Sequence, residues 1–351
     1  MLLNAFDVDP GLPERTLELQ VGELFGLGVQ ADLLVVSAFQ GVYEPVPGTL
    51  IARLQEACGL EVGSLPVALD LRQSRLGCWV SEPLAQCCPP VRWPDGSRTR
   101  FRRIAVVESL PADPKAANPE SWPVFNQLFC LLALLPLHGI ASATVATPLL
   151  ATGNQGIAPQ LLFPALLERC RDGFRHIPDL ERLVLFDREL GPLEQLAALI
   201  DGELNRPETQ RKLIALQEDF LPPEALVDLL LSFSGRHQQL KLDGDIQELH
   251  HQLSNTQTTA VALGIHSRRL VERLVRQRLG WRYGTLNEGI LELRRHNLHP
   301  WIISCLHQVR VFGNMVSHPG KPGQQRDVHV TDVVAMLAAL QRVLADYPWS
   351  L

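Results

Sequence analysis

Three side chains near the C-terminal end of the chain have the types and spacing needed to act on a phosphate. Arg310, Asn314 and His318 recur every four residues, and Pro319 follows directly. On an α-helix each step of four turns the side chain by about 40°, so the three would form one inclined stripe. Imidazole titrates near neutral pH and guanidinium carries a permanent fork-shaped charge. The pattern fits a His318 base, an Arg310 charge stabiliser and an Asn314 that orients His318 or the phosphate.

The same residues also fit a purely structural role. Arg310 could form an ion pair with Glu288 or Glu292 on a neighbouring helix, and His318 could cap the end of its own helix, which Pro319 terminates. The residue types and their spacing leave both readings open.

A second candidate site for phosphate lies in the first half of the chain. An apolar, β-type run from Ala143 to Leu150 leads into a glycine-containing loop, and a helix-like segment from Gln160 to Arg171 follows. Glycines allow close approach of the backbone to a ligand, and amides at a helix N-terminus attract anions. The loop residues expected to bind are Thr152, Gly153, Asn154, Gln155 and Gly156. No Walker-type lysine follows the loop, so ATP hydrolysis is not expected.

An upstream segment, Leu17 to Gly59, fits the same site. It reads as a strand, a short loop, a buried strand from Ala31 to Gln40, a loop from Tyr43 to Gly48, and a helix from Thr49 to Cys58.

Residues 15 to 190 resemble a macro domain, the ADP-ribose-binding module. Ala31 to Gln40 is similar to the family's Asp-x-Ile-Val-Asn-Ala-Ala-Asn strand end, and Ala151 to Gly156 is similar to its diphosphate loop. Arg103 to Val107 resembles the strand between the two halves. The resemblance implies that Glu23, Ser37, Gln40 and Gly48 contact the ligand, and that Glu23 accepts a hydrogen bond from the adenine amine. Ser37 and Gln40 stand where the family has asparagines, which favours a nucleotide-binding module over a hydrolase.

Residues 240 to 347 resemble a HEPN-type helical domain. Val309 to His318 has the form apolar-Arg-x-x-Gly-Asn-x-x-x-His, and Leu270 to Arg276 is similar to an earlier helix of that family. The resemblance implies metal-independent RNA cleavage, with attack of the 2′-hydroxyl on the adjacent phosphate, in a homodimer that brings two motifs together. By analogy of domain type, the chain is then a nucleotide sensor with an RNA-cleaving effector in prokaryotic stress or antiviral defence. The alternative is a non-catalytic ADP-ribose-binding adaptor with a helical dimerisation module.

The fold expected is α/β plus all-α: a three-layer α/β/α macro-like domain over 1–200 and a helical bundle over 208–351. Leu183 to Phe186 reads as the last strand of the first domain, and periodicity is helical almost throughout after Pro207. There, Leu213, Leu216 and Phe220 share one helical face. Later helices are expected over residues 258–279, 285–296, 300–317 and 331–345, with Thr285 and Thr331 as N-caps.

Charge and cysteine content limit the classes of function. The net charge of −6 argues against a broadly basic nucleic-acid binder, yet residues 257–326 hold eleven Lys and Arg against three Asp and Glu. That basic segment is either a surface for a polyanion such as RNA or a set of solvated helix faces. The seven cysteines are odd in number and lack metal-ligand spacing, which indicates reduced thiols and no metal site.

Other features of the sequence indicate a cytoplasmic protein. The N-terminus lacks the pattern of a signal peptide, and Pro136 and Gly139 interrupt the uncharged stretch from Leu128 to Gly153, so no membrane segment is expected. The only small molecule implied is an ADP-ribose-like nucleotide as ligand, and no cofactor is required.

Overall fold

The computed structural model describes residues 2–7, 15–27, 29–74, 76–87, 91, 93–94, 100–109, 123–150, 159–203, 213–215, 224–236, 242–254, 257–280, 284–317 and 328–349. These residues form two compact units. One unit is an α/β unit, Val8–Leu199. The other is a helical unit that combines Ile200–Leu351 with the N-terminal segment Met1–Asp7.

The α/β unit is built on a mixed sheet whose strands run in the order β2-β8-β7-β3-β6-β5-β4. The first five of these strands are parallel to one another, and β5 and β4 continue the sheet in antiparallel pairing. Their bounds are Thr16–Val21 for β2, Arg182–Asp187 for β8, Thr144–Pro148 for β7, Ala31–Phe39 for β3, Phe101–Ser109 for β6, Cys78–Ser81 for β5 and Val67–Asp70 for β4.

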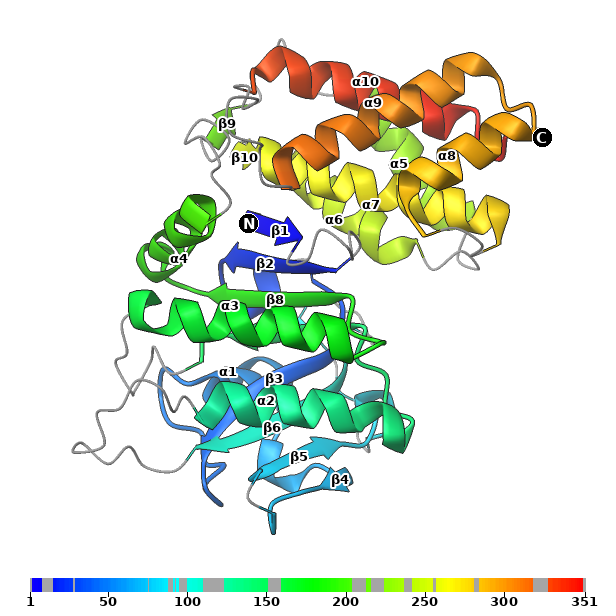
Figure 1. Ribbon diagram of the computed structural model, residues 1–351. Helices are drawn as coiled ribbons and strands as arrows, with labels where there is room; N and C mark the ends of the chain where they lie inside the picture. The colour runs from blue at the N-terminus through cyan, green and yellow to red at the C-terminus, as the bar shows by residue number, and fades with distance from the viewer. Residues whose placement is uncertain are drawn as a thin grey trace. The chain divides into compact units, whose positions relative to one another are not determined.

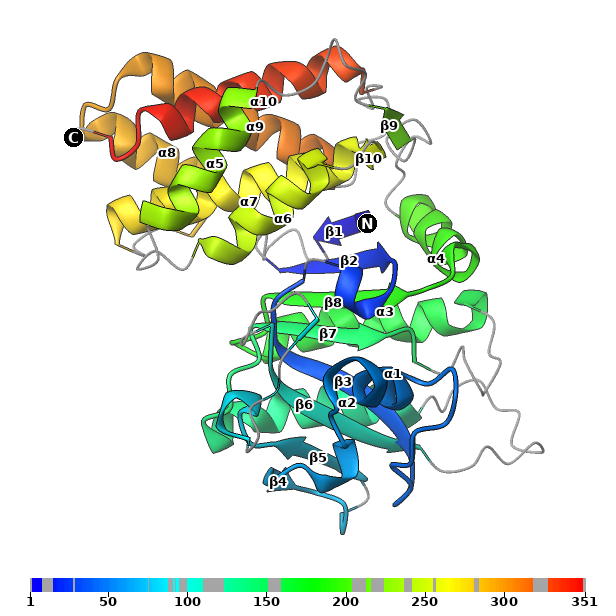
Figure 2. The ribbon, with the colours of Figure 1, turned by 180° about the vertical axis from the view of Figure 1, so that it is seen from behind.

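Helices cover both faces of this sheet, so its central strands are apolar on both sides. In β3, Leu33, Leu34, Val35 and Val36 are all completely buried, as expected for a parallel strand between two helical layers. Helices α2 (Pro123–Leu134) and α3 (Pro159–His176) cover the face seen in Figure 1, and α1 (Leu50–Cys58) covers the opposite face, seen in Figure 2. The three-layer α/β/α arrangement predicted from the sequence is confirmed.

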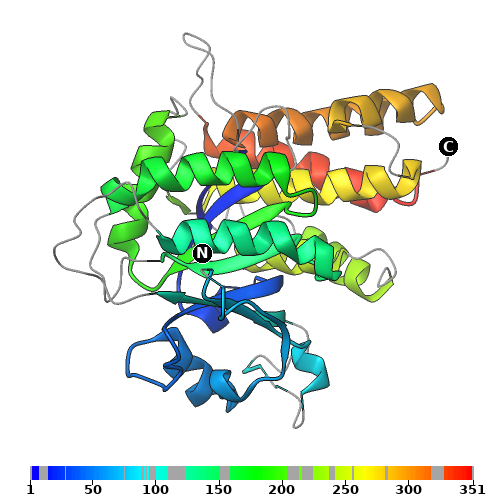
Figure 3. The same ribbon diagram turned by 60° about the horizontal axis from the view of Figure 1, so that its bottom comes forward.

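Helices α2 and α3 lie side by side on the sheet (Figure 3). Gly173 of α3 permits this approach, because a Cβ atom at that position would lie 2.6 Å from the ring of Phe129 in α2. Helix α4 (Leu190–Glu203) then leads from the α/β unit into the helical unit.

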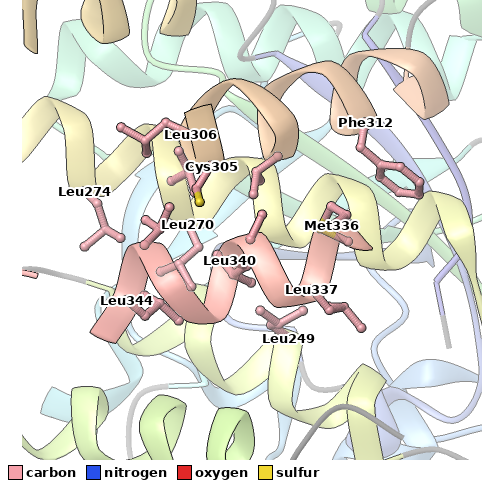
Figure 4. Close-up of a cluster of buried hydrophobic side chains, with 14 of the residues drawn as sticks. Leu249, Leu270, Leu274, Cys305, Leu306, Phe312, Met336, Leu337, Leu340 and Leu344 are labelled. Atoms are coloured by element: carbon pink, nitrogen blue, oxygen red, sulfur yellow. The ribbon is translucent and has the colours of Figure 1, made fainter. Parts of the chain in front are cut away.

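The helical unit contains the predicted run of helices. They are α5 (Glu224–Arg236), α6 (Asp243–Ser254), α7 (Ala260–Leu279), α8 (Leu286–Arg295), α9 (Pro300–Ser317) and α10 (Val330–Ala345). Figure 4 shows the apolar core between them, in which Leu270 of α7, Leu306 of α9 and Leu340 of α10 are completely buried. The all-α class predicted for this part of the chain is therefore confirmed.

Local signals predicted some helix ends and missed others. Thr285 is the N-cap of α8, where its hydroxyl accepts from the Glu288 amide at 3.3 Å and forms a capping box. Thr331 as the cap of α10 is wrong, because α10 begins at Val330 and His329 is its N-cap. Helix at Leu213 is also wrong: Leu213–Ala215 form a short strand, β9, that pairs with β10 (Gln257–Thr259). Leu216 and Phe220 lie outside the described residues.

The N-terminal strand β1 (Leu2–Asp7) packs in the helical unit, which the sequence reading did not anticipate. Leu2 and Ala5 are part of the helical unit's apolar core. Asp7 accepts from Nη1 of Arg268 in α7 at 3.0 Å and from the Ser317 hydroxyl of α9 at 3.4 Å. The limits 1–200 and 208–351 for two evolutionary domains stay a prediction.

The described part of the chain was found to hold neither a membrane-spanning helix nor a metal-binding cluster. None of its helices combines the length and the apolar character that crossing a bilayer requires. Its His, Cys, Asp and Glu side chains form no cluster of three or more that could hold a metal ion.

Candidate functional site

A cavity of about 580 Å³ opens in the α/β unit where parallel strands end. It lies at the carboxyl ends of β2, β3, β7 and β8, which is the edge where open α/β sheets bind ligands. Its lining includes Gly22, Glu23, Leu24, Ser37, Ala38, Phe39, Val42, Glu44, Val46, Gly48, Thr49, Leu50, Ile51, Arg53, Val124, Pro148, Leu149, Leu150, Phe186, Asp187, Arg188, Glu189 and Pro192. Its volume is in the range of small-molecule and cofactor pockets.

The parallel strands bring residues from distant parts of the sequence to this edge. Leu34 of β3 is in register with Ala146 of β7 and with Ile104 of β6, so these strands end close together. The first polar residues after the buried runs therefore converge. Ser37, at the end of β3, is exposed toward this edge, and Glu23 follows β2 directly.

The N-terminus of α1 forms another part of the cavity wall. Gly48 has a φ of +87°, a conformation that L side chains rarely adopt, and it directs the chain into the helix. Thr49 is the N-cap, and its hydroxyl accepts from the Ala52 amide at 3.2 Å. Leu50 and Ile51, in the first helical turn, line the cavity as well. The free amides of a first turn attract anions, so this wall suits a negatively charged ligand group.

Charges of both signs surround the cavity. Glu44, Asp187 and Glu189 accompany Glu23 on its lining, and the cationic side chains there are Arg53 and Arg188. Nη2 of Arg53 lies 2.9 Å from Oε1 of Glu23. Hydrogen bonding to Glu23 raises the pKa of Arg53 above its ordinary value. The Glu23 carboxylate therefore contacts a cation carried by α1.

Three of the four residues predicted from the upstream segment line one cavity. Glu23, Ser37 and Gly48 do so, whereas Gln40 is exposed and is not among the lining residues. The loop residues Thr152, Gly153, Asn154, Gln155 and Gly156 lie outside the described residues. Leu150, the last described residue before that loop, lines the cavity.

The sequence reading missed two parts of the lining. Asp187 is the last residue of β8, Arg188 and Glu189 come directly after it, and all three line the cavity. The sequence contains a signal for these residues, because polar residues appear at the end of a buried parallel strand, as Ser37 does in β3. Arg53 lies one helical turn after the Thr49 cap, a position that shares the N-terminal face of α1.

In the helical unit, Arg310 and Asn314 lie on α9 and are partly buried, while His318 lies outside the described residues. Among the described residues Arg310 makes no ion pair, and its Nε is buried without a hydrogen-bond partner. Burial, and secondarily the charge of Arg268, lower the pKa of Arg310. The acids proposed as its partners are engaged elsewhere: Glu292 pairs with Arg295 at 2.7 Å and Glu288 accepts from the Gly284 amide at 3.1 Å.

The glycine of the same motif has a packing role. A Cβ atom on Gly313 would lie 2.7 Å from Cβ of Arg268 and 3.1 Å from the carbonyl oxygen of Gly264 on α7. Gly264 in turn faces Val316, whose Cγ2 would be 2.6 Å from an added Cβ. The two glycines let α7 and α9 approach closely.

Comparisons with known proteins give a family for part of the helical unit. Residues 247–347 match the family described as "Domain of unknown function (DUF4145)". No curated protein sequence matches the chain.

Solved structures give distant likenesses. The Trypanosoma brucei macrodomain in complex with ADP-ribose is 14% identical, with a TM-score of 0.39 over 56% of this chain and 74% of that one. The Oceanobacillus iheyensis macrodomain with MES bound is 12% identical, with a TM-score of 0.40 over 58% of this chain and 97% of that one. At these values the likeness adds nothing to the layers and strand order described above.

Proposed function

We propose that the α/β unit binds ADP-ribose or a closely related nucleotide. The observation that carries the proposal is the convergence of three residues from separate parts of the unit on one nucleotide-sized cavity: Glu23 after β2, Ser37 at the end of β3 and Gly48 before α1. The resemblance in sequence predicts the same three residues as ligand contacts. The edge of parallel strands and the N-terminus of α1 supply the environment that phosphates require.

The proposed roles follow from the chemistry of each group. Glu23, paired with Arg53, accepts a hydrogen bond from the exocyclic amine of adenine. The loop from Thr152 to Gly156 binds the diphosphate through backbone amides, and Gly48 with the first turn of α1 closes the site around it. Ser37 contacts the distal ribose, and Gln40 belongs to the loop that follows. Neither position has the asparagine of the macro family, so we assign binding without turnover.

A titration with a panel of ligands tests this proposal. Isothermal titration of the full chain is carried out with ADP-ribose, ADP, adenosine and ribose 5-phosphate. We expect ADP-ribose to bind best, because it alone contains both the adenosine and the distal ribose. Absence of heat with ADP-ribose at any concentration below about 1 mM would contradict the proposal, since such weak binding corresponds to only about 4 kcal/mol. Release of ADP-ribose from a modified protein would instead identify a hydrolase.

For the helical unit we propose RNA cleavage that requires the Arg310, Asn314 and His318 stripe. A specific observation favours it: Arg310 is a partly buried cation with no ion pair among the described residues, as a group reserved for a phosphate would be. His318 would take the proton of the 2′-hydroxyl, whose oxygen attacks the adjacent phosphorus as the bond to the 5′-oxygen breaks and that oxygen takes a proton from water. Arg310 would stabilise the negative charge on the phosphoryl oxygens, and Asn314 would orient the imidazole or the phosphate. Two copies facing each other as a homodimer would complete the site.

One assay separates this effector from a non-catalytic adaptor. Purified protein is incubated with total RNA, with and without ADP-ribose, alongside His318→Ala and Arg310→Ala. Arg295→Ala is a matched control, because Arg295 is largely exposed and already pairs with Glu292. Cleavage lost in the first two variants and kept in the control supports the effector, with a proposed setting of prokaryotic defence. No cleavage under any condition supports an adaptor. Sedimentation would then detect the dimer that an adaptor forms.

A further inference from the structure

One wall of the cavity is an irregular segment, residues 40–48, between β3 and α1. Val42, Glu44, Val46 and Gly48 of this segment line the cavity and are all exposed. Its own backbone supports it sparsely: the Val42 amide donates to the Phe39 carbonyl at 2.9 Å, and the Thr49 amide donates to the Val46 carbonyl at 3.0 Å. Something outside the segment must therefore fix it, because unsupported loops open locally at little free-energy cost.

Tyr43 is the residue of this segment that reaches the protein interior. Its hydroxyl donates to Oε1 of Glu108, a side chain only 4% exposed near the end of β6. It also accepts a hydrogen bond from Nε1 of the buried Trp79 at 3.2 Å. The Tyr43 and Trp79 rings meet edge to face, with centroids 5.7 Å apart and planes at 85°. One phenol thus joins the segment to two strands of the sheet.

The surroundings of Tyr43 leave its ring little freedom. A Cβ atom on Gly63 would lie 3.1 Å from Cβ of Tyr43, so this glycine provides the space in which the tyrosine packs. The Arg72 guanidinium lies 5.7 Å from the centroid of the Trp79 ring, and Nη2 of Arg72 contacts Asp70 at 2.5 Å. Aromatic and hydrogen-bonding groups therefore surround the tyrosine side chain, which lies outside the cavity itself.

We propose that Tyr43, through its hydrogen bond to Glu108, is a positioning residue that holds residues 40–48 as the wall of the nucleotide cavity. This proposal rests on the proposed function for its consequence in binding. The hydroxyl contacts no cavity-lining group among the contacts above, so its effect on a ligand is exerted through the backbone of Val42 and Glu44. Preorganisation of this kind raises affinity by removing the cost of ordering a loop on binding.

Hydrogen exchange of the ligand-free full chain tests the positioning directly. Tyr43→Phe removes only the hydroxyl and keeps the ring. We expect about tenfold faster exchange in peptides covering residues 40–49, the factor that corresponds to losing one hydrogen bond to a charged group. Tyr347→Phe is the matched control, because its hydroxyl has a 3.4 Å contact to Gln277 in the helical unit. That control should leave exchange over 40–49 unchanged.

Titration of the same variants with ADP-ribose tests the consequence. Tyr43→Phe should bind about tenfold more weakly, mainly through faster dissociation, because the wall must be ordered at each binding event. Glu108→Leu should reproduce the loss, and combining it with Tyr43→Phe should add little, since both remove the same hydrogen bond. Glu108→Gln keeps an acceptor and should retain most of the affinity.

The outcomes distinguish this proposal from the proposed function. If wild-type protein binds no ADP-ribose, the proposed function fails, and the exchange of residues 40–49 still decides whether Tyr43 holds the wall. Unchanged exchange in Tyr43→Phe overturns the proposal. Faster exchange with unaltered ADP-ribose affinity overturns it as well, because the hydroxyl would then order the loop without serving the site.

Discussion

Gly313→Ala isolates the packing role of a motif residue in the helical unit. Gly313 is buried on α9, and an added Cβ would lie 2.7 and 2.9 Å from Cβ and Cδ of Arg268, both shorter than the contacts that real Cβ atoms make. The Gly264 carbonyl at 3.1 Å blocks a shift along α7. The methyl group can be accommodated only if α7 and α9 move apart.

The net effect is the difference between two opposing terms. Overpacking a tight contact costs about 1–3 kcal/mol, while replacing glycine by alanine inside a helix gains about 1 kcal/mol. The clash involves a Cβ and a backbone oxygen, which cannot rotate away, so we place the cost near its upper limit. We expect Gly313→Ala to destabilise the helical unit by about 2 kcal/mol, or roughly 4–8 °C in melting temperature for a unit of this size.

Thermal unfolding followed by far-UV circular dichroism measures this difference. Gly202→Ala is the matched control, because an added Cβ there meets nothing within 4 Å on α4. The control should melt at or slightly above the wild-type temperature. If Gly313→Ala melted as high as the control, the close approach of α7 and α9 through the motif glycine would be refuted.

Three further predictions concern buried groups. Burial and the hydrogen bond to Glu108 raise the pKa of Tyr43. The stability that this tyrosine contributes should therefore be complete below about pH 10 and be lost as the pH rises through the raised pKa. In urea unfolding between pH 8 and 11, Tyr43→Phe should lose part of the pH dependence of the free energy of unfolding. Burial raises the pKa of Cys78 to about 12, so at pH 7.5 iodoacetamide should label the exposed Cys130 and spare Cys78, and mass spectrometry showing equal labelling would contradict this. Asp7→Ala should destabilise the chain by about 3 kcal/mol in urea unfolding, since the buried charge of Arg268 would lose one of its partners. A loss below about 1 kcal/mol would mean that this ion pair does not hold β1.

The strand-end part of the site could be predicted because it depends on local order. Glu23 comes shortly after β2 and Ser37 lies near the end of β3, and parallel strands end at a common edge. Gln40 is not among the lining residues, because a tight turn intervenes: Gly41 has a φ of +69°, and the Val42 amide donates back to Phe39, so the chain changes direction just after β3. Nothing in a single sequence fixes that geometry.

Contacts between distant segments account for what the sequence reading missed. The short strand β1 is held by Arg268, 261 residues away, so no local pattern indicates it. Leu213 has helical spacing to Leu216 and Phe220, yet pairing of β9 with β10, more than forty residues on, overrides that preference. Likewise, the motif glycine is explained only by its approach to Gly264 across two helices.

The same distinction applies to the electrostatics of the site. The pairing of Glu23 with Arg53 required the relative placement of β2 and α1, 30 residues apart. Charge counts alone would not have separated this pair from Arg53 with Glu56, which lies at 3.3 Å on the same helix. The sequence therefore predicted Glu23 as a ligand contact, which stays a prediction, and the structure adds the ion pair that Glu23 forms with Arg53.

The most direct test of the nucleotide site is calorimetric titration of a cavity-filling variant with ADP-ribose. Ser37 is exposed at the cavity edge of β3, so Ser37→Trp should fill the site while the fold is kept, which an unchanged melting curve would verify. Ser304→Trp places the same side chain on an exposed position of α9. We expect wild type and Ser304→Trp to bind alike and Ser37→Trp to lose at least tenfold in affinity. Equal affinity in all three proteins would show that ADP-ribose does not occupy this cavity.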